Sequence, residues 1–93
     1  MLNDRQIASR LAALDGWTRE GNAIVKTFHF ADYHETLAFV NAVAWIAQRS
    51  DHHPDLEVGY DRCRVSYTTH SAGGLTDEDF AAAARIDALF FTP

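Results

Sequence analysis

The sequence has 93 residues and a formal net charge of −5, from eight basic and thirteen acidic side chains. This length predicts one domain, residues 1–93, with a single modest core. The acidic balance counts against nucleic acid or an anionic membrane surface as a partner, because both require a basic footprint.

Cysteine content and hydropathy indicate the compartment. Cys63 is the only cysteine and cannot form an internal disulfide, which favours a reducing environment. No apolar run approaches the roughly 20 residues of a membrane-spanning helix. The N-terminal residues also lack the apolar region of a signal peptide. We therefore expect a cytoplasmic location.

The first predicted element is a helix. Asn3 or Asp4 can cap its N-terminus. Asp15 and Gly16 are expected to end it, because glycine tolerates the left-handed conformation of helix ends. The apolar positions have helical spacing: Ile7, Leu11 and Leu14.

A hairpin over residues 17–30 is expected next, with its turn at 20–22. The second strand places alternate side chains on one face, which we expect to point into the core. The exception on that face is Lys26, expected near an edge. The apolar members are Ile24, Phe28 and Phe30.

A long helix is predicted from Asp32, which forms a capping-box pattern with Glu35, to the break before Pro54. Its apolar arc is wider than one sheet face needs. We expect part of this helix to be buried against another subunit, although a deeply buried helix of a monomer has the same pattern. The arc comprises Leu37, Phe39, Val40, Val43, Ala44, Trp45, Ile46 and Ala47.

Two strands at 56–60 and 62–69, a glycine loop at 71–75 and a helix capped by Thr76 complete the predicted order. The last helix has apolar positions through residue 90. The order is αββαββα with strands in antiparallel pairs. This favours an α+β fold, in which a four-stranded antiparallel sheet has its helices packed on one face.

Three of the five histidines lie at boundaries of predicted elements: His52, His53 and His70. At such boundaries a rigid scaffold can hold reactive groups toward solvent. Three interpretations stay open on the residues alone. The histidines can be turn and cap residues, since the helix dipole favours them at C-termini. They can bind a metal, or they can transfer protons to and from a bound small molecule.

The metal interpretation is the weakest of the three. Neighbouring side chains of an extended segment point apart, as those of His52 and His53 would. Cys63 lies in mid-strand, and no second histidine or cysteine has chelating spacing. Asp79 also has a structural interpretation, because it fills the reciprocal position of a capping box with Thr76. The same helix N-terminus can nevertheless present amides to a ligand.

The pattern of these residues resembles the signature of the pterin-4a-carbinolamine dehydratases. The likeness covers residues 11–87, nearly the whole chain, and its fixed spacings make it specific. It is carried by His52-His53-Pro54, Tyr60, Thr69-His70, Gly73-Gly74-Leu75-Thr76 and Asp79, and by the flanking segments 14–17 and 28–33.

The resemblance implies the same αββαββα fold, assembled into homodimers or dimers of dimers. It implies dehydration of 4a-hydroxytetrahydropterin to quinonoid dihydropterin, which returns the cofactor spent by aromatic amino acid hydroxylases. The pterin is then the substrate, and no further cofactor or metal is expected. The family's essential histidines map onto His52, His53 and His70, and its acid maps onto Asp79.

Two positions depart from the family pattern. Gln48 stands where the family usually has a charged side chain, and Leu56 stands where an aromatic often occurs. Gln48 can hydrogen-bond a pterin edge but cannot act as a carboxylate. Pro54 is expected to support the substrate site. Our hypothesis is that His52 and His70 transfer protons while His53 orients the substrate.

Two alternatives stand beside the enzyme. The first is a non-catalytic pterin-binding protein or a dimeric scaffold or coactivator. Animal relatives bind a homeodomain transcription factor through a helix, and some homologues have lost the histidines. The second is a pterin-related role in folate or molybdopterin metabolism. The presence of all three histidines favours the enzyme.

Overall fold

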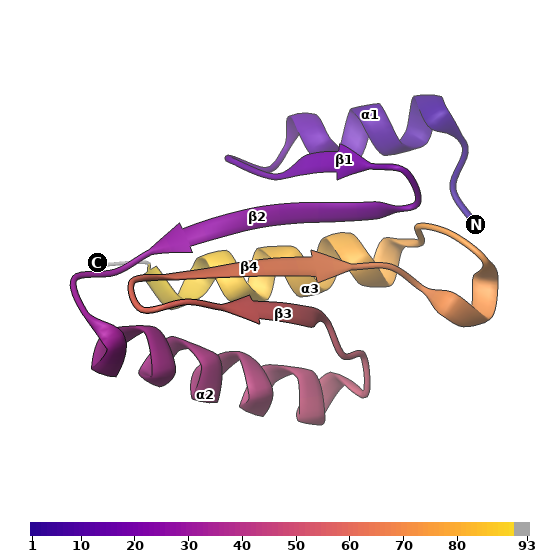
Figure 1. Cartoon of the computed structure of the whole chain (residues 1–93). Coiled ribbons are helices and arrows are strands. Elements are labelled where there is room, and N and C mark those ends of the chain that lie inside the picture. The colour runs from indigo at the N-terminus through magenta and orange to yellow at the C-terminus, as the bar shows by residue number, and fades with distance from the viewer. Residues whose placement is uncertain (91–93) are drawn as a thin grey trace.

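The computed structural model describes residues 1–90, which form three α-helices and a four-stranded sheet (Figure 1). The α-helices are α1 (Asp4–Ala12), α2 (Tyr33–Ser50) and α3 (Asp77–Asp87). The strands are β1 (Thr18–Glu20), β2 (Ala23–His29), β3 (Asp55–Val58) and β4 (Arg62–Tyr67). Two 3-10 turns follow β4 and α3: η1 (His70–Ala72) and η2 (Ala88–Phe90).

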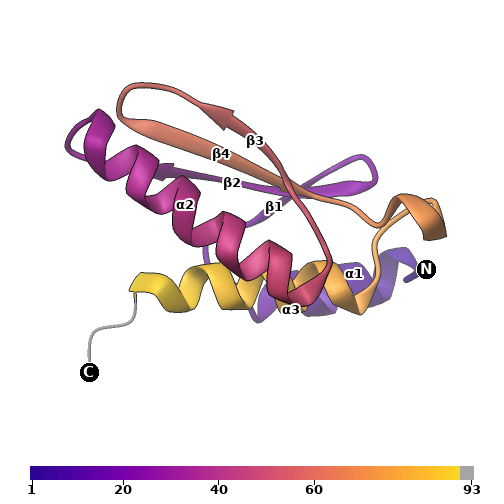
Figure 2. The same cartoon turned by 90° about the horizontal axis from the view of Figure 1, so that it is seen from below.

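The sheet has the order β1-β2-β4-β3, and every neighbouring pair is antiparallel. Figure 2 shows α1, α2 and α3 on one side of this sheet. The predicted α+β fold is therefore confirmed, including the position of the helices on one face. One continuous core lies between the two layers. Its main members are Ile7, Trp17, Ile24, Phe28, Phe39, Val43, Cys63, Val65, Tyr67, Leu75, Phe80 and Ile86.

Helix α1 begins as predicted but ends earlier. Asn3 forms a reciprocal capping box with Gln6, both bonds being 2.9 Å long. The helix ends at Ala12, and the Leu14 amide then bonds the Leu11 carbonyl in the tighter 3-10 pattern. The predicted end at residues 15–16 is thus wrong. The positive φ of Gly16 serves the turn into β1 instead.

The predicted hairpin is confirmed, and so is the exceptional position of Lys26 on its core face. Lys26 lies on β2 just beyond the last residue that pairs with β1. Its ammonium group is 3.0 Å from the Asp87 carboxylate, which also accepts a hydrogen bond from the Trp17 indole at 3.0 Å. Asp87 therefore neutralises the positive charge of Lys26 at a point of β2 that is no longer paired with β1.

Strand β4 and helix α3 both end earlier than the sequence predicts. Strand β4 stops at Tyr67, and Thr69 then forms an isolated bridge with Gly74 around the η1 turn. Helix α3 stops at Asp87, so Leu89 and Phe90 belong to η2 and are exposed. Because β4 ends at Tyr67, residues 68–76 form a loop between β4 and α3.

The wide apolar arc of α2 is largely explained by the core of the same chain. Phe39, Val43 and Ala47 are buried between the sheet and α3. Leu37 and Trp45 are left exposed, and Trp45 has 65% of its surface accessible. Association with a second subunit through this face stays a prediction.

Candidate active site

His52 lies in the turn between α2 and β3. Asp51 caps α2 in the left-handed conformation, with φ of 52°. The His52 amide still bonds the Ala47 carbonyl at 3.3 Å. The imidazole is largely buried, with 14% of its side chain exposed. Its Nε2 lies 2.6 Å from Oδ1 of Asp79 on α3.

Asp79 is fully buried at the start of α3. Its Oδ2 accepts hydrogen bonds from the Thr76 amide at 2.9 Å and from the Thr69 hydroxyl at 2.8 Å. The first of these is the reciprocal bond of the capping box, so the structural interpretation of Asp79 is confirmed. The other oxygen faces His52. One carboxylate therefore fixes the helix start and orients an imidazole.

The hydrogen bonds around Asp79 determine which group is the donor in each pair. A carboxylate only accepts, so Thr69 donates its single hydroxyl proton to Asp79. The Thr76 hydroxyl, 2.9 Å from the Thr69 oxygen, must then be the donor in that pair. By the same reasoning His52 carries a proton on Nε2. Its Nδ1 has no hydrogen-bond partner within residues 1–90.

Tyr67 on β4 packs against the His52 ring. The two rings are stacked with centroids 5.1 Å apart, and the Tyr67 hydroxyl lies 3.4 Å from the His52 carbonyl. Burial raises the pKa of Tyr67 to about 12. The negative charge of Asp79 also raises this pKa, whereas the positive charge of Arg85 lowers it. The phenol is therefore neutral over the physiological range, and it packs against the imidazole without adding charge.

His70 lies in different surroundings. It begins the η1 turn, its side chain is exposed, and the Gly73 amide bonds its carbonyl at 3.1 Å. It lines a cavity of about 290 Å³ with Asn22, Ala23, Thr68 and Gly73. The His70 side chain makes no hydrogen bond within residues 1–90, so its ring is accessible from this cavity.

The other predicted site residues surround the α2–β3 turn. His53 is exposed, Pro54 is half-buried and Gln48 is exposed one turn before His52. The chain therefore brings His52 and Asp79 into contact. It connects them to His70 only through Thr69, the residue before it.

Two contributors to the site were missed from the sequence. Thr69 lies in the stretch Thr69-His70 that carries the family resemblance, but the sequence indicates no role for it, because a threonine at a strand end is ordinary and its partner Asp79 is ten residues away. Tyr67 alternates with polar residues along β4, a pattern that indicates a core position, and it is indeed buried there. Its contact with His52 arises from the α2–β3 turn, which periodicity does not describe.

Residues 1–90 contain no group of three His, Cys, Asp or Glu side chains arranged to hold a metal ion. None of their helices combines the length and the apolar character needed to cross a lipid bilayer.

The chain is similar to known proteins over nearly its whole length. The pattern of the pterin 4 alpha carbinolamine dehydratase family matches residues 1–89. A protein of Nitrosospira multiformis, provisionally named as a pterin-4-alpha-carbinolamine dehydratase, is 54% identical over 89 residues, which cover 96% of this chain and 79% of that protein. A Xanthomonas campestris protein with the same provisional name is 54% identical over 91 residues, covering 96% and 77%.

Two solved structures share the fold. The transcriptional coactivator/pterin dehydratase of Brucella melitensis has a TM-score of 0.90 at 33% identity, over 95% of this chain and 96% of that one. A pterin dehydratase-like protein identified as a RuBisCO assembly factor in the alpha-carboxysome has a TM-score of 0.66 at 26% identity, over 83% and 89%. The fold therefore serves in proteins with different described roles. The match over residues 1–89 and the relatives at 54% identity show that this chain belongs to the pterin 4 alpha carbinolamine dehydratase family.

Proposed function

We propose that this protein dehydrates 4a-hydroxytetrahydropterin to quinonoid dihydropterin by histidine acid–base catalysis. A proton added to the C4a hydroxyl lets the C4a–O bond break and water leave. Loss of the N5 proton completes the C4a=N5 double bond. The two proton transfers balance, so the net reaction releases one water molecule. The steps use no metal, nucleotide or covalent intermediate, and the pterin is the substrate.

The single observation that carries the proposal is the pairing of His52 with a buried carboxylate. Asp79 holds Nε2 at 2.6 Å, which fixes the ring orientation and leaves Nδ1 for exchange. A binding protein has no need for an imidazole whose tautomer is set in this way. A positioned general acid or base typically contributes about 10²–10⁴-fold to a rate.

The remaining residues have complementary roles. His70, whose side chain makes no hydrogen bond within residues 1–90, is the second proton-transfer group. His53 orients the substrate, and Gln48 hydrogen-bonds a pterin edge. Pro54 holds the turn that carries both neighbouring histidines.

The test is a direct dehydration assay with chemically generated 4a-hydroxytetrahydropterin. We expect His52→Ala and His70→Ala each to lower kcat by about 10²–10⁴-fold. The matched control is His34→Ala, because His34 is an exposed histidine in the first turn of α2. Full turnover by the His70→Ala variant would contradict the assignment.

A non-catalytic binding role is the second candidate. The RuBisCO assembly factor favours it, since that protein is described as pterin dehydratase-like and shares the fold. A reduced pterin analogue should raise the melting temperature of an enzyme or of a pterin-binding protein, because it binds the folded state, but not that of a scaffold that binds no pterin. Only the enzyme should also turn over the carbinolamine, so the two measurements together separate the candidates.

The setting of the reaction belongs to the same proposal. We place the protein in the cytoplasm as a single-domain homo-oligomer that recycles a pterin cofactor. Leu37 and Trp45, exposed on α2, are the apolar side chains available for contact between subunits. Light scattering after size exclusion should give a mass above the 10.4 kDa of one chain. A monomer at micromolar concentration would remove the oligomer from the proposal.

A further inference from the structure

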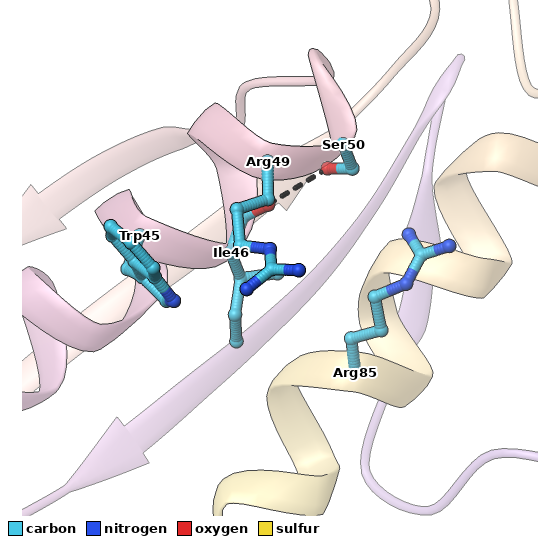
Figure 3. A pocket seen from close by; sticks show the side chains of 5 residues that line it. All are labelled: Trp45, Ile46, Arg49, Ser50 and Arg85. Carbon is cyan, nitrogen blue, oxygen red and sulfur yellow. Dashed lines mark hydrogen bonds between the residues drawn. The ribbon is translucent and has the colours of Figure 1, made fainter.

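The pocket between α2 and α3 offers little free surface to a ligand. Figure 3 shows Arg49 on α2 and Arg85 on α3 on opposite sides of this pocket. Its aromatic wall is Trp45, which is available for contact between subunits, and the Arg49 guanidinium lies over the indole ring at 5.7 Å. The cavity beside His70 is in a different position, because none of the residues that line it belongs to α2.

Three segments of the chain meet at the end of the sheet where His70 lies. Strand β4 ends there, and the pairing registers place the first residues of β2 and β3 beside its last ones. The turn that precedes β2 carries Asn22, and the turn that precedes β3 carries His52. Figure 1 shows both turns at the end of the sheet where the loop after β4 begins. Because β4 lies between β2 and β3, the His70 loop has the His52 turn on one side and the Asn22 turn on the other.

The turn that carries Asn22 is fixed relative to His70. Thr68, two residues before His70, donates its hydroxyl proton to the main-chain carbonyl of Asn22 at 2.6 Å. Arg19 holds the preceding residue of the same turn, because its Nε donates to the Gly21 carbonyl at 2.9 Å. The main chain of this turn is therefore held from two sides, and the Asn22 side chain projects from a fixed point on the cavity wall.

The side-chain amide of Asn22 is available to a ligand. It is exposed and makes no hydrogen bond within residues 1–90. It lies toward the loop after β4, since a Cβ placed on Gly74 would come 3.9 Å from its Oδ1. A Cβ placed on Gly73, which lines the cavity, would meet no atom within 4 Å. The small residues of the cavity, Gly73 and Ala23, therefore leave room for a flat ring.

The chemistry of the cavity suits an uncharged ligand with an amide-like edge. None of its lining residues is Asp, Glu, Lys or Arg. The Thr68 proton is used in the bond to the turn, so the side-chain donors left are the Asn22 amide and the His70 imidazole. A carboxamide offers one donor and one acceptor side by side, the pattern with which asparagine reads adenine. The N3–H and C4=O groups of a pterin are complementary to it, and C4 is bonded to C4a, the carbon from which water leaves.

We propose that Asn22 is a substrate-binding residue, whose side-chain amide forms two hydrogen bonds with the N3–H and C4=O groups of the pterin ring. This places C4a beside His70, the second proton-transfer group. Gln48, one turn before His52, is left for a different edge of the ring. The inference rests on the proposed function, and it adds a residue that transfers no proton but selects the heterocycle.

The first test is calorimetric titration with two non-reacting ligands, dihydropterin and N3-methyl dihydropterin. Asn22→Ala should weaken dihydropterin binding roughly 10- to 100-fold, the effect of two lost hydrogen bonds. Methylation of N3 removes the donor, so the wild type should bind the methylated ligand less tightly by a similar factor. Asn22→Ala should bind both ligands with equal affinity, because the group that distinguishes them is gone.

Turnover of 4a-hydroxytetrahydropterin is the second measurement. Asn22→Ala should raise KM by a similar factor and leave kcat unchanged, because the two hydrogen bonds are the same in the ground state and the transition state. The urea midpoint should also stay unchanged, since the main-chain carbonyl of Asn22 still accepts the Thr68 bond. Asn22→Gln moves the amide by one methylene and should not restore KM. His34→Ala, the control of the dehydration assay, should keep the wild-type affinity.

The outcomes separate this inference from the proposed function. Wild-type affinity of Asn22→Ala for dihydropterin would overturn the role of Asn22 while leaving the dehydratase in place. A preference of that variant for dihydropterin over the methylated ligand, equal to the preference of the wild type, would do the same. If the wild type bound neither ligand and did not turn over the carbinolamine, the proposed function would fail and the role of Asn22 with it.

Discussion

His52 and His70 belong to the same proposed site but have opposite surroundings. His52 is largely buried, stacked on Tyr67 and bonded to a buried carboxylate. His70 is exposed, lines an open cavity and has no side-chain hydrogen bond within residues 1–90. The contrast shows that the fold holds one of the two proposed proton-transfer groups rigidly and leaves the other exposed. The position of His52 depends on its hydrogen bond to Asp79. Substitutions around Asp79 should therefore affect His52 far more than His70.

The largest effect is expected from Asp79→Ala. This change leaves the His52 Nε2–H, the Thr69 hydroxyl and the Thr76 amide without their acceptor. Removing one partner of a buried charged network costs about 3–5 kcal/mol. Urea unfolding should show this loss in the free energy of unfolding.

Asp61→Ala is the matched control for that experiment, because Asp61 is exposed in the turn between β3 and β4. It should change the free energy of unfolding by less than about 0.5 kcal/mol. A loss below about 1 kcal/mol for Asp79→Ala would mean that the network contributes little beyond an ordinary helix cap.

The next effect concerns Thr69, the residue that connects the two regions. Thr69→Val keeps the shape of the side chain but removes the donor to Asp79 and the acceptor for Thr76. An unmade buried hydrogen bond costs about 1–3 kcal/mol. Thr69→Ser restores the hydroxyl and should recover most of the stability and of the turnover. Thr27→Val, at an exposed threonine of β2, is the control.

The pH profile of turnover separates positioning from bulk stability in the Thr69 variants. If Thr69 orients Asp79, Thr69→Val should move the profile of kcat while Thr69→Ser should not. A profile that stays unchanged in Thr69→Val would limit Thr69 to a structural role.

The fold could be predicted because each element has a local cause. Alternation in β4, the cap at Thr76 and the break before Pro54 all act within a few residues. The pairing of His52 with Asp79 could not be derived this way, because it joins residues 27 apart through tertiary packing. The resemblance to the family supplied both residues but gave no indication of their contact. Thr69 belongs to the pattern that resembles the family, but neither that pattern nor the local sequence indicates its hydrogen bond to Asp79.

A smaller effect is expected from Tyr67→Phe, and it depends on pH. The folded-state pKa of Tyr67 is about 12, above the ordinary value of 10. The folded chain therefore favours the neutral phenol. This stability is complete below pH 10 and is lost as pH rises toward 12. Between pH 9 and 11 the wild type should lose about 1.4 kcal/mol more than Tyr67→Phe. Urea unfolding measures both proteins at pH 9 and pH 11. If the wild type and Tyr67→Phe lost equal free energy of unfolding between these pH values, this prediction would be contradicted.

The smallest stability effect is expected at His70, and it completes the contrast. His70→Ala removes an exposed side chain without a hydrogen bond to residues 1–90, so the free energy of unfolding should change by less than about 0.5 kcal/mol. His52→Ala leaves Oδ1 of the buried Asp79 without its hydrogen-bond partner and should cost about 1–3 kcal/mol. Both variants should nevertheless lose turnover. A His70→Ala variant that loses stability as His52→Ala does would show that His70 is a structural residue, and its low turnover would then say nothing about proton transfer.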